Sequence, residues 1–586
     1  GAPRGRLQAL RRASPEAPVE AFMAKRSRLH ALKRALITLS AIAGTAVAAL
    51  SFAVSRSAVA PPTTTIDLRA PGPGTIERVE GVWFLWLSGP PEVRGADMYR
   101  LSGEAMRRID GSMHQTFAEL VPSWPLRKAV EAFGRIAARN LDEDIPVEIQ
   151  REIVGQVFAY DDPFDDGGGK YSRFLSYLAL HDLAQTIERS PLIACSAFAV
   201  TGPASASGGT LLGRNFDFEA GRIFDEEKAV SVFRPERGHR FATVAWPGMN
   251  GVVTGINERR VWVSVNAARS DHESSRGTPV SLLIRQVLET ADDADHAARL
   301  LRQAHTRVAD LYLVGDRERA FVVEKTPARA ALRAPERDRL VVANHFLNPE
   351  LRAEARNQAL ERQTSSLVRF ERLRQQIEGA NAPLDVKGAL AVLRDRTSPQ
   401  GEPYPVGDRR AIDGYIATHG VIADLGRDAL WISGAPHLSG RWLGVKLGAL
   451  FEGRVEQVEG LPADEASLRA GDALAMAVED PAIGVVHTRI AADEQRHAEL
   501  AWRALAWLLE GADEAALRFA ADCFDEAMAA AQCDPPARDR VARGDGLLSA
   551  PELGALRRQT LREVIAPCAA ALCRRPALAR APGPLS

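Results

Sequence analysis

The apolar residues of this chain change their spacing near Ala194, and this change constrains the fold more than any other feature. From about Val79 to Ser190 they mostly recur every three or four residues, as in GEAMRRIDGSMHQTFAEL, which is typical of helices, and the polar loop DDPFDDGGGK at 161–170 interrupts this spacing. From Ala194 onward short apolar runs follow one another between turn residues such as Asn257-Glu258, which predicts strands. These strands would form two large antiparallel sheets: CSAFAV, TLLGRNFD, RFATVAW, GVVTGI, VWVSVNA, DLYLVG, AFVVEKT and LVVANH.

Helical runs lie between these strands, at SLLIRQVLETA, at DHAARLLRQAH and in the long segment from Glu350 to Glu378. Strands return at GYIATHGVIAD and ALWISGA. Because strands and helices alternate in blocks, we expect the helices to cover the outer faces of the sheets. The sequence therefore predicts an α+β sandwich over residues 195–456, preceded by a helical pre-region at 79–194. Beyond Gln457 the Ala-rich sequence predicts a separate all-α domain over 457–586.

An uncharged apolar stretch, ALITLSAIAGTAVAALSFAVS, occupies residues 35–55 and is long enough to span a bilayer. The basic residues before it predict that 1–34 are cytoplasmic and that the bulk of the chain lies in the periplasm or cell envelope: Lys25, Arg26, Arg28, Lys33 and Arg34. A cleavable signal and a buried Ala-rich core helix are the alternatives. The closely spaced Pro and Gly residues of 56–78 predict an extended linker.

Charge and cysteine placement exclude several classes of protein. With 74 Lys and Arg against 75 Asp and Glu, the net charge is -1, which argues against nucleic acid as a partner. Cys195 is the single cysteine of the first 522 residues, so a disulfide framework across the main body is excluded. The other cysteines could pair in an oxidising compartment or remain reduced: Cys523, Cys533, Cys568 and Cys573.

Cys195 begins the strand CSAFAV, and the following strand ends in Arg214-Asn215-Phe216-Asp217. A hairpin through the GPASASGG loop would bring Arg214 and Asp217 near the Cys195 thiol. A neighbouring cation lowers the pKa of a thiol, and the thiolate is the nucleophile. If the chain were cut before Cys195, the new α-amino group could act as a general base. The alternatives are a buried structural cysteine and an ordinary surface ion pair.

Several ordered motifs make residues 80 to 452 resemble the penicillin acyltransferase-like (acyl-coenzyme A:aminopenicillanate acyltransferase) family of cysteine N-terminal-nucleophile hydrolases. Choloylglycine hydrolases are more distant relatives. The motifs are HDLAQ at His181, CSAFAV at Cys195, LLGRNFDFE at Leu211, GVVTGINERRVWVSVNA at Gly251, VVANHFLNPEL at Val341 and SSLVRFERL at Ser365. The resemblance implies a four-layer αββα sandwich, made as an inactive precursor that cuts itself between Ala194 and Cys195.

The resemblance also implies roles for individual residues. Cys195 would be the nucleophile and its freed amine the base, while Arg214 and Asp217 would orient both groups. Asn266 would donate its side-chain amide to the tetrahedral oxyanion. Further motif residues face the site in the family: Asn344, and Arg369 with Arg372 and Arg374 as alternatives on the same helical stretch. His345, beside Asn344, is expected to be structural.

The tail segment RIAADEQRHAELAW places Glu494 and His497 on one helix face, as in one half of a ferritin-like di-metal site. Residues 457–586 contain no second Glu-x-x-His pair, so these two are weak metal candidates unless two tails associate. A solvated helix face is the favoured alternative.

The sequence thus predicts a membrane-anchored, self-processing amidohydrolase or acyltransferase that forms an acyl-enzyme on Cys195. The acyl group would come from a small amide or thioester and pass to water or an amine. We expect no cofactor, with acyl-coenzyme A as one candidate co-substrate. The alternatives are a catalytically dead scaffold member of the fold and a metal-binding ferritin-like module with a passenger domain.

Overall fold

The computed structural model describes residues 59–468 with internal gaps, together with Arg518 and Ala521. The gaps are 122, 125, 126, 129, 132–139, 164–169, 180, 183, 184, 186–192, 219 and 220. The chain divides into two compact units, Gly1–Pro462 and Ala463–Ser586, and nearly all described residues belong to the first. The predicted membrane span at 35–55, the metal candidates Glu494 and His497, and the tail cysteines lie outside the described residues. Within the described part of the chain, no helix combines the length and the apolar character that crossing a bilayer requires.

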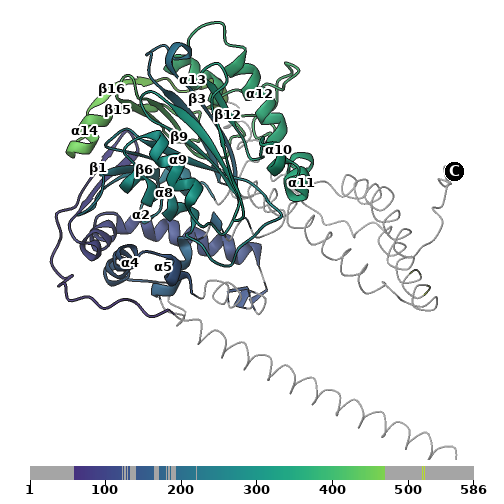
Figure 1. Ribbon diagram of the computed structural model, residues 1–586. Coiled ribbons are helices and arrows are strands. Elements are labelled where there is room, and N and C mark those ends of the chain that lie inside the picture. The colour runs from purple at the N-terminus through teal and green to yellow at the C-terminus, as the bar shows by residue number, and fades with distance from the viewer. Residues whose placement is uncertain are drawn as a thin grey trace, which may run out of the picture. The chain divides into compact units, whose positions relative to one another are not determined.

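Two large sheets form the centre of the first unit (Figure 1). The nine-stranded sheet has the order β1-β2-β5-β6-β7-β8-β9-β10-β11. Its strands are β1 (Thr75–Val79), β2 (Val82–Ser88), β5 (Ala229–Arg234), β6 (Phe241–Ala245), β7 (Thr254–Asn257), β8 (Trp262–Ala267), β9 (Asp310–Gly315), β10 (Ala320–Lys325) and β11 (Ala330–Arg333).

The seven-stranded sheet has the order β12-β3-β4-β13-β14-β15-β16. Its strands are β3 (Ile193–Val200), β4 (Leu211–Phe218), β12 (Arg339–Val342), β13 (Ala417–Asp424), β14 (Ala429–Ser433), β15 (Trp442–Lys446) and β16 (Gln457–Leu461). All strands predicted from the sequence are present. Every pair is antiparallel except β2 with β5. Strand β16 pairs with β15, so this sheet extends past the boundary expected at residue 456.

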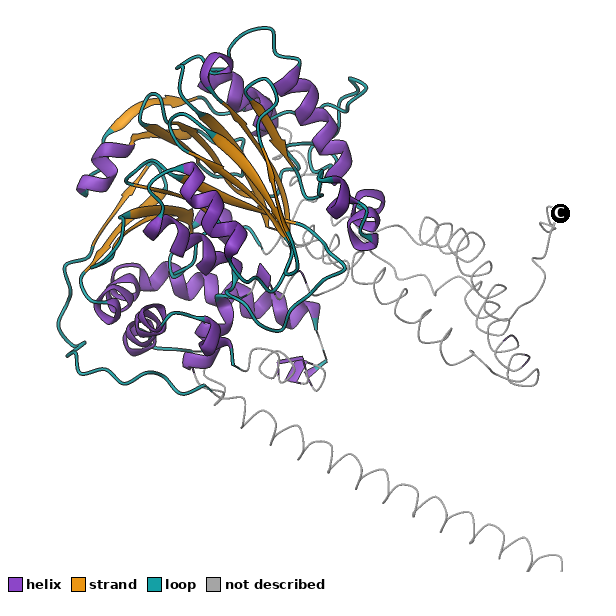
Figure 2. Ribbon diagram, in the orientation of Figure 1, coloured by secondary structure: helices purple, strands orange, loops and turns teal. Residues whose placement is uncertain are grey.

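Helices cover the outer face of each sheet (Figure 2). Against the nine-stranded sheet pack α2 (Pro91–Leu120), α8 (Val280–Thr290) and α9 (Ala294–Gln303), with α4 (Val147–Ala159) and α5 (Lys170–Tyr177) beside α2. Against the seven-stranded sheet pack α12 (Ser366–Glu378) and α13 (Val386–Leu393). The remaining short helices are α7 (Ile223–Glu226), α10 (Pro349–Arg352), α11 (Ala355–Gln363) and α14 (Leu447–Glu452).

Three buried apolar layers result from this arrangement. Alternate residues of a strand point to opposite faces, so Leu212 of β4 packs between the sheets while Leu211 packs against the outer helices. A third layer joins the nine-stranded sheet to its own helices, through residues such as Val265 and Leu288. The predicted α+β sandwich, with helices outside two facing sheets, is therefore present.

The pre-region at 79–194 is not wholly helical, contrary to expectation. Strand β2 lies between β1 and β5 in the nine-stranded sheet, and Phe84 is fully buried in the layer between the sheets. Helices α2 and α4 cross where Gly95 meets Gly155, and a Cβ on either glycine would lie 1.8 Å from a backbone oxygen of the other helix. The pre-region is thus an integral part of this unit.

The segment from Glu350 to Glu378 forms three helices and not one. The Asn348 side chain caps α10 by accepting from the backbone N–H of Glu350. Thr364 ends α11 in an extended conformation, and the serine pair after it begins α12. Short polar side chains favour helix ends because they bond to nearby backbone groups, and this local preference outweighs the continuous helical spacing.

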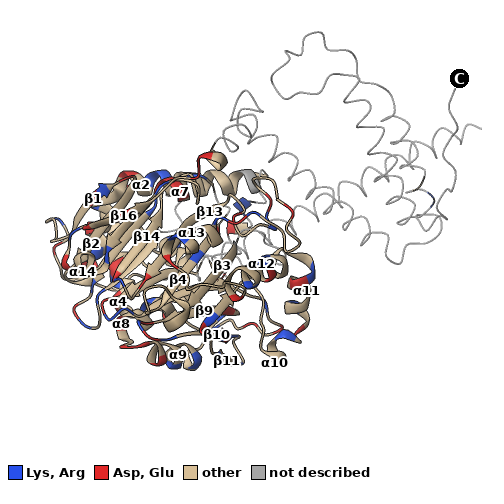
Figure 3. Ribbon diagram, turned by 90° about the horizontal axis from the view of Figure 1, so that it is seen from above, with Lys and Arg blue, Asp and Glu red and all other residues tan. Residues whose placement is uncertain are grey.

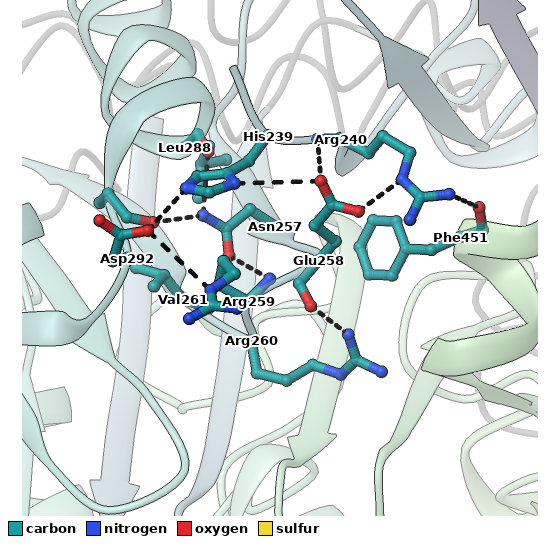
Figure 4. Close-up of polar contacts among 11 residues, drawn as sticks. His239, Arg240, Asn257, Glu258, Arg259, Arg260, Val261, Leu288, Asp292 and Phe451 are labelled. Atoms are coloured by element: carbon teal, nitrogen blue, oxygen red, sulfur yellow. Dashed lines mark hydrogen bonds and ion pairs between the residues drawn. The ribbon is translucent and has the colours of Figure 1, made fainter.

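The turn between β7 and β8 is fixed by Asn257, as the Asn-Glu dipeptide predicted (Figure 4). The Asn257 Oδ1 accepts from the backbone N–H groups of Arg259 and Val261 at 3.0 and 2.9 Å. Its Nδ2 donates to the carbonyl of Leu288 at 2.9 Å. These bonds hold in register β7 and β8, the strands that carry Thr254 and Asn266 at their other ends.

Basic and acidic residues are interspersed over the elements of the described unit (Figure 3). Many of them form ion pairs, for example Arg352 with Glu361 and Arg374 with Glu371.

Candidate active site

Cys195 lies in β3, which pairs with β4 in the hairpin that the sequence predicted. Cys195 pairs with Phe216 and Ala197 pairs with Arg214 across the two strands. Side chains two residues apart share a face, so Cys195 lies on the face of Ala197 and Arg214 on that of Leu212, both of which pack between the sheets. The Cys195 side chain is fully buried.

The Arg214 guanidinium links the two sheets beside the sulfur. Its Nη2 donates to the Cys195 Sγ at 3.5 Å and to the carbonyl of Val265. Its Nη1 donates to the carbonyl of Val253 at 2.7 Å and to the hydroxyl of Thr254. Arg214 itself is fully buried, and its guanidinium carbon lies 4.7 Å from the centre of the Phe216 ring.

Burial raises the pKa of the Cys195 thiol above its ordinary value in this uncut chain, with Asp217 acting in the same direction. Arg214 and Arg369 act in the opposite direction, as expected of cations near a thiol. The predicted effect of Arg214 is therefore present, but burial outweighs it.

Asn344 and Arg369 bind the backbone of Cys195. The Asn344 Oδ1 accepts from the Cys195 N–H at 3.0 Å. Arg369 donates from Nη1 to the Cys195 carbonyl at 2.6 Å and from Nη2 to the Asn344 Oδ1 at 2.9 Å. The sequence left Arg372 and Arg374 as alternatives, but Arg372 pairs with Asp395 and Arg374 with Glu371. Arg369 is the arginine of this helix that lies at the site.

Asp217 lies on the opposite face of the hairpin from the thiol. It pairs with Ala194, the residue before Cys195, and is almost fully buried. Burial raises the pKa of Asp217 to about 7, although Arg369 and Arg409 act against this rise. Its Oδ1 has no hydrogen-bond partner among the described residues, which is costly for a buried carboxyl oxygen.

Asn266 lies next to this set but does not contact Cys195 through a hydrogen bond among the described residues. Its Nδ2 donates to the carbonyl of Ala343 at 2.8 Å, and its Oδ1 has no partner there. Asn344 mirrors this contact, since its Nδ2 donates to the carbonyl of Ala267 at 2.8 Å. The two asparagines therefore cross-link β8 to the end of β12.

Sequence reasoning did not single out three polar residues of this region: Thr254, His419 and Ser366. Thr254 and His419 contact each other behind Arg214, with 2.9 Å between Oγ1 and Nε2. The Ser366 Oγ accepts from the Asn344 N–H at 2.9 Å and lies 2.8 Å from the His345 Nδ1. His345 was expected to be structural, and burial lowers its pKa to about 4. All lie within predicted strands or helices, where a polar side chain more often faces solvent, so the sequence carries little signal for them.

A cavity of about 110 Å³ lies next to this region. It reaches the site through Phe216, which pairs with Cys195, and Val253, whose carbonyl binds Arg214. The pre-region helices form one wall and β4 with the 246–250 loop form the other. Most of the lining is apolar, including Met106, Met113, Phe174, Phe218, Trp246 and Met249.

In the part of the chain that the structure describes, no group of three His, Cys, Asp or Glu side chains is arranged to hold a metal ion.

Comparison with known proteins finds a family model that matches this region. Residues 205–413 match the model of the acyl-coenzyme A:6-aminopenicillanic acid acyl-transferase family. The resemblance predicted from the sequence motifs is confirmed. The matched segment contains Arg214, Asp217, Asn266, Asn344 and Arg369, and it begins ten residues after Cys195. The likeness of the tail to a ferritin-like domain receives no support from this match and stays a prediction.

A curated relative, an uncharacterized protein of Archaeoglobus fulgidus, is 26% identical over 313 residues. The match covers 46% of this chain and 51% of that protein, so the chain spans about half the length of the curated relative it matches.

Among solved structures, an ortholog of N-acylethanolamine-hydrolyzing acid amidase from Caenorhabditis elegans is 18% identical with a TM-score of 0.30, covering 40% of this chain and 93% of that one. Penicillin V acylase from Agrobacterium tumefaciens is 14% identical with a TM-score of 0.29, covering 46% and 99%.

Proposed function

We propose that this chain is a self-processing amidohydrolase or acyltransferase whose nucleophile is Cys195. One observation carries the proposal: three buried side chains bind three polar groups of a single residue. Arg214 binds the sulfur, Asn344 binds the nitrogen and Arg369 binds the carbonyl oxygen. The backbone groups of any buried cysteine need partners, but an ordinary one needs no buried cation at its sulfur.

Self-cleavage would begin with attack of the Cys195 sulfur on the carbonyl carbon of Ala194. A C–S bond forms, the Ala194–Cys195 C–N bond breaks, and the thiol proton passes to the departing nitrogen. Water then hydrolyses the thioester, which leaves a carboxyl group on Ala194 and restores the Cys195 thiol. The bond between the Cys195 N–H and Asn344 would hold the scissile peptide in place during this reaction.

The freed α-amino group supplies the base for later turnovers. Asp217 lies across the hairpin from Ala194, and its buried Oδ1, which has no partner among the residues the structure describes, would accept from the new ammonium group. In each turnover the thiolate attacks the carbonyl carbon of an amide or thioester and expels an amine or thiol, which takes up a proton. Water or an amine then attacks the acyl-enzyme and releases the sulfur.

The oxyanion of each tetrahedral intermediate would be bound by Asn266. Its Nδ2 donates to the Ala343 carbonyl in the uncut chain, so this role requires it to exchange that carbonyl for the substrate oxygen. A single donor of this kind lowers the activation barrier by about 2.7–4 kcal/mol.

The apolar cavity beside Phe216 supports an uncharged, apolar acyl group, because burying a charge there would be costly. Acyl-coenzyme A stays a candidate acyl donor. Anchoring through residues 35–55, a location outside the cytoplasm and self-association of the tail are further proposals, and they rest on the sequence alone.

A panel of amides with a common chromogenic amine tests the chemistry. We expect the processed protein to release the amine from butyryl, octanoyl and phenylacetyl amides, and far more slowly from the succinyl amide, whose chain ends in a carboxylate. The Cys195→Ala variant serves as the blank. No release above that blank with any member would contradict an amidohydrolase.

A scaffold protein is the second candidate, and the complete burial of Cys195 in the uncut chain favours it. It predicts a chain that persists uncut and releases no amine.

A further inference from the structure

Two polar residues lie behind Arg214 on its far side from the sulfur. Thr254 belongs to β7 of the nine-stranded sheet and His419 to β13 of the seven-stranded sheet. Both are fully buried. Neither carries out a step of the proposed reaction, so their contacts need another explanation.

These residues continue a directed chain of hydrogen bonds. Arg214 has no acceptor atom, so its Nη1 donates to the Thr254 hydroxyl oxygen. The hydroxyl hydrogen is then available to donate to the His419 Nε2, 2.9 Å away. This assigns the ring hydrogen of His419 to Nδ1, which has no partner among the described residues. The His419 ring also stacks on Phe216, with centres 5.1 Å apart and planes at 19°.

We propose that Thr254 and His419 are positioning residues that aim the Arg214 guanidinium at the Cys195 sulfur. The guanidinium is a rigid planar fork, so the direction of Nη1 sets the direction of Nη2. Thr254 binds Nη1, and Nη2 binds the sulfur. This inference rests on the proposed role of Cys195 as the nucleophile.

The charges around this chain suit a neutral His419. Burial lowers its pKa well below the ordinary value, and the neighbouring cations Arg214 and Lys228 act in the same direction. A protonated ring would carry an N–H on Nε2 and could no longer accept from Thr254. The charged groups that act on the thiol are Arg214 and Arg369, which favour the thiolate, and Asp217, which opposes it.

The test measures the Cys195 thiolate directly. Its absorbance near 240 nm is titrated with pH in the full-length protein, and the same variant with Cys195→Ala is subtracted. Thr254→Val keeps the shape of the side chain but removes the hydroxyl, whereas Thr254→Ser keeps the hydroxyl. Thr243→Val is the matched control, because Thr243 is a buried threonine of β6 whose hydroxyl donates to the Thr254 carbonyl at 3.3 Å.

We expect Thr254→Val to raise the titration midpoint by at least about 0.5 pH unit, a fraction of the 1–3 units that a close opposite charge supplies. Thr254→Ser and Thr243→Val should stay within about 0.2 unit of the parent, and Arg214→Ala sets the upper limit of the shift. An unshifted midpoint in folded Thr254→Val would overturn the proposal.

If Thr254→Val does not fold, His419→Leu is compared with His419→Gln, whose amide oxygen can still accept from Thr254. A shift in His419→Leu that is absent in His419→Gln supports the proposal, and equal midpoints overturn it. The titration needs no substrate. A parent that never releases amine, combined with a shifted Thr254→Val, would therefore reject the proposed function and keep the positioning role.

Discussion

Asp217 is the residue whose surroundings would change most if the chain were cut. In the uncut chain it is a buried carboxyl group with one oxygen that has no partner among the described residues. Burial raises its pKa to about 7. A new ammonium group on Cys195 would supply both a hydrogen-bond donor and a positive charge. The uncut state therefore carries a cost that cleavage would relieve.

This cost has a definite pH dependence. A carboxyl group with a raised folded pKa makes the folded chain less stable as pH rises from about 4, the ordinary aspartate value, to about 7. In uncut Cys195→Ala protein we expect the stability to fall between pH 5 and pH 8, and Asp217→Asn to remove roughly 2–3 kcal/mol of that fall. Thermal unfolding at both pH values measures the difference. Burial also raises the pKa of Asp182 to about 7. Asp182 titrates in both proteins, so its contribution cancels when their two losses of stability are compared. An equal loss of stability in the two proteins would refute the raised pKa of Asp217.

At the scale of elements, the β3–β4 hairpin was the most predictable part of the site. Its turn composition and alternation place Arg214 on the face of Cys195, and the structure has this register. The same hairpin argument also brought Asp217 near the thiol, which is wrong for its side chain: Asp217 pairs with Ala194 and lies on the other face. The choice of Arg369 among three arginines could not be made from the sequence, because neighbours on one helix differ only in what packs against them.

Strand β2 was missed for a related reason. Its sequence, VWFLWLS, is a short apolar run inside a region of helical spacing, and such a run does not by itself distinguish a strand from a buried helix segment. Its parallel partner β5 lies far along the chain, so the pairing leaves no local signal. The contact between Thr254 and His419 could not be predicted either, since the two residues belong to strands of different sheets.

The contact between the pre-region helices and the core centres on Glu152 of α4. Its carboxylate accepts from Arg94 of α2 at 2.8 Å and from Arg285 of α8 at 2.6 and 2.7 Å, and all three residues are buried. Burial alone would raise the pKa of Glu152, but the two arginines outweigh it and lower the pKa to about 2.

We expect Glu152→Gln to destabilise the protein by about 3–5 kcal/mol, because it leaves two buried cations without their anion. The matched control is Glu371→Gln, which breaks an exposed pair with Arg374 and should cost at most about 1 kcal/mol. Urea unfolding of the full chain compares them. Equal midpoints would show that Glu152 does not anchor the pre-region.

At the scale of the whole molecule, the pre-region and the core share one sheet and one buried layer. Cleavage before Cys195 would separate them covalently, yet β2 would still lie between β1 and β5. We expect the two fragments to co-elute in size-exclusion chromatography and to part only in denaturant. Separate elution in native buffer would contradict this expectation, and uncut Cys195→Ala protein provides the reference volume.

The central claim is that Cys195 cuts its own chain and then serves as the amino-terminal nucleophile. Amino-terminal sequencing with intact-mass measurement of the freshly purified protein tests it most directly. We predict two polypeptides, one beginning with Cys195, and a single uncut chain for Cys195→Ala. A parent chain that stays uncut, or one whose new terminus lies at another residue, would contradict the account.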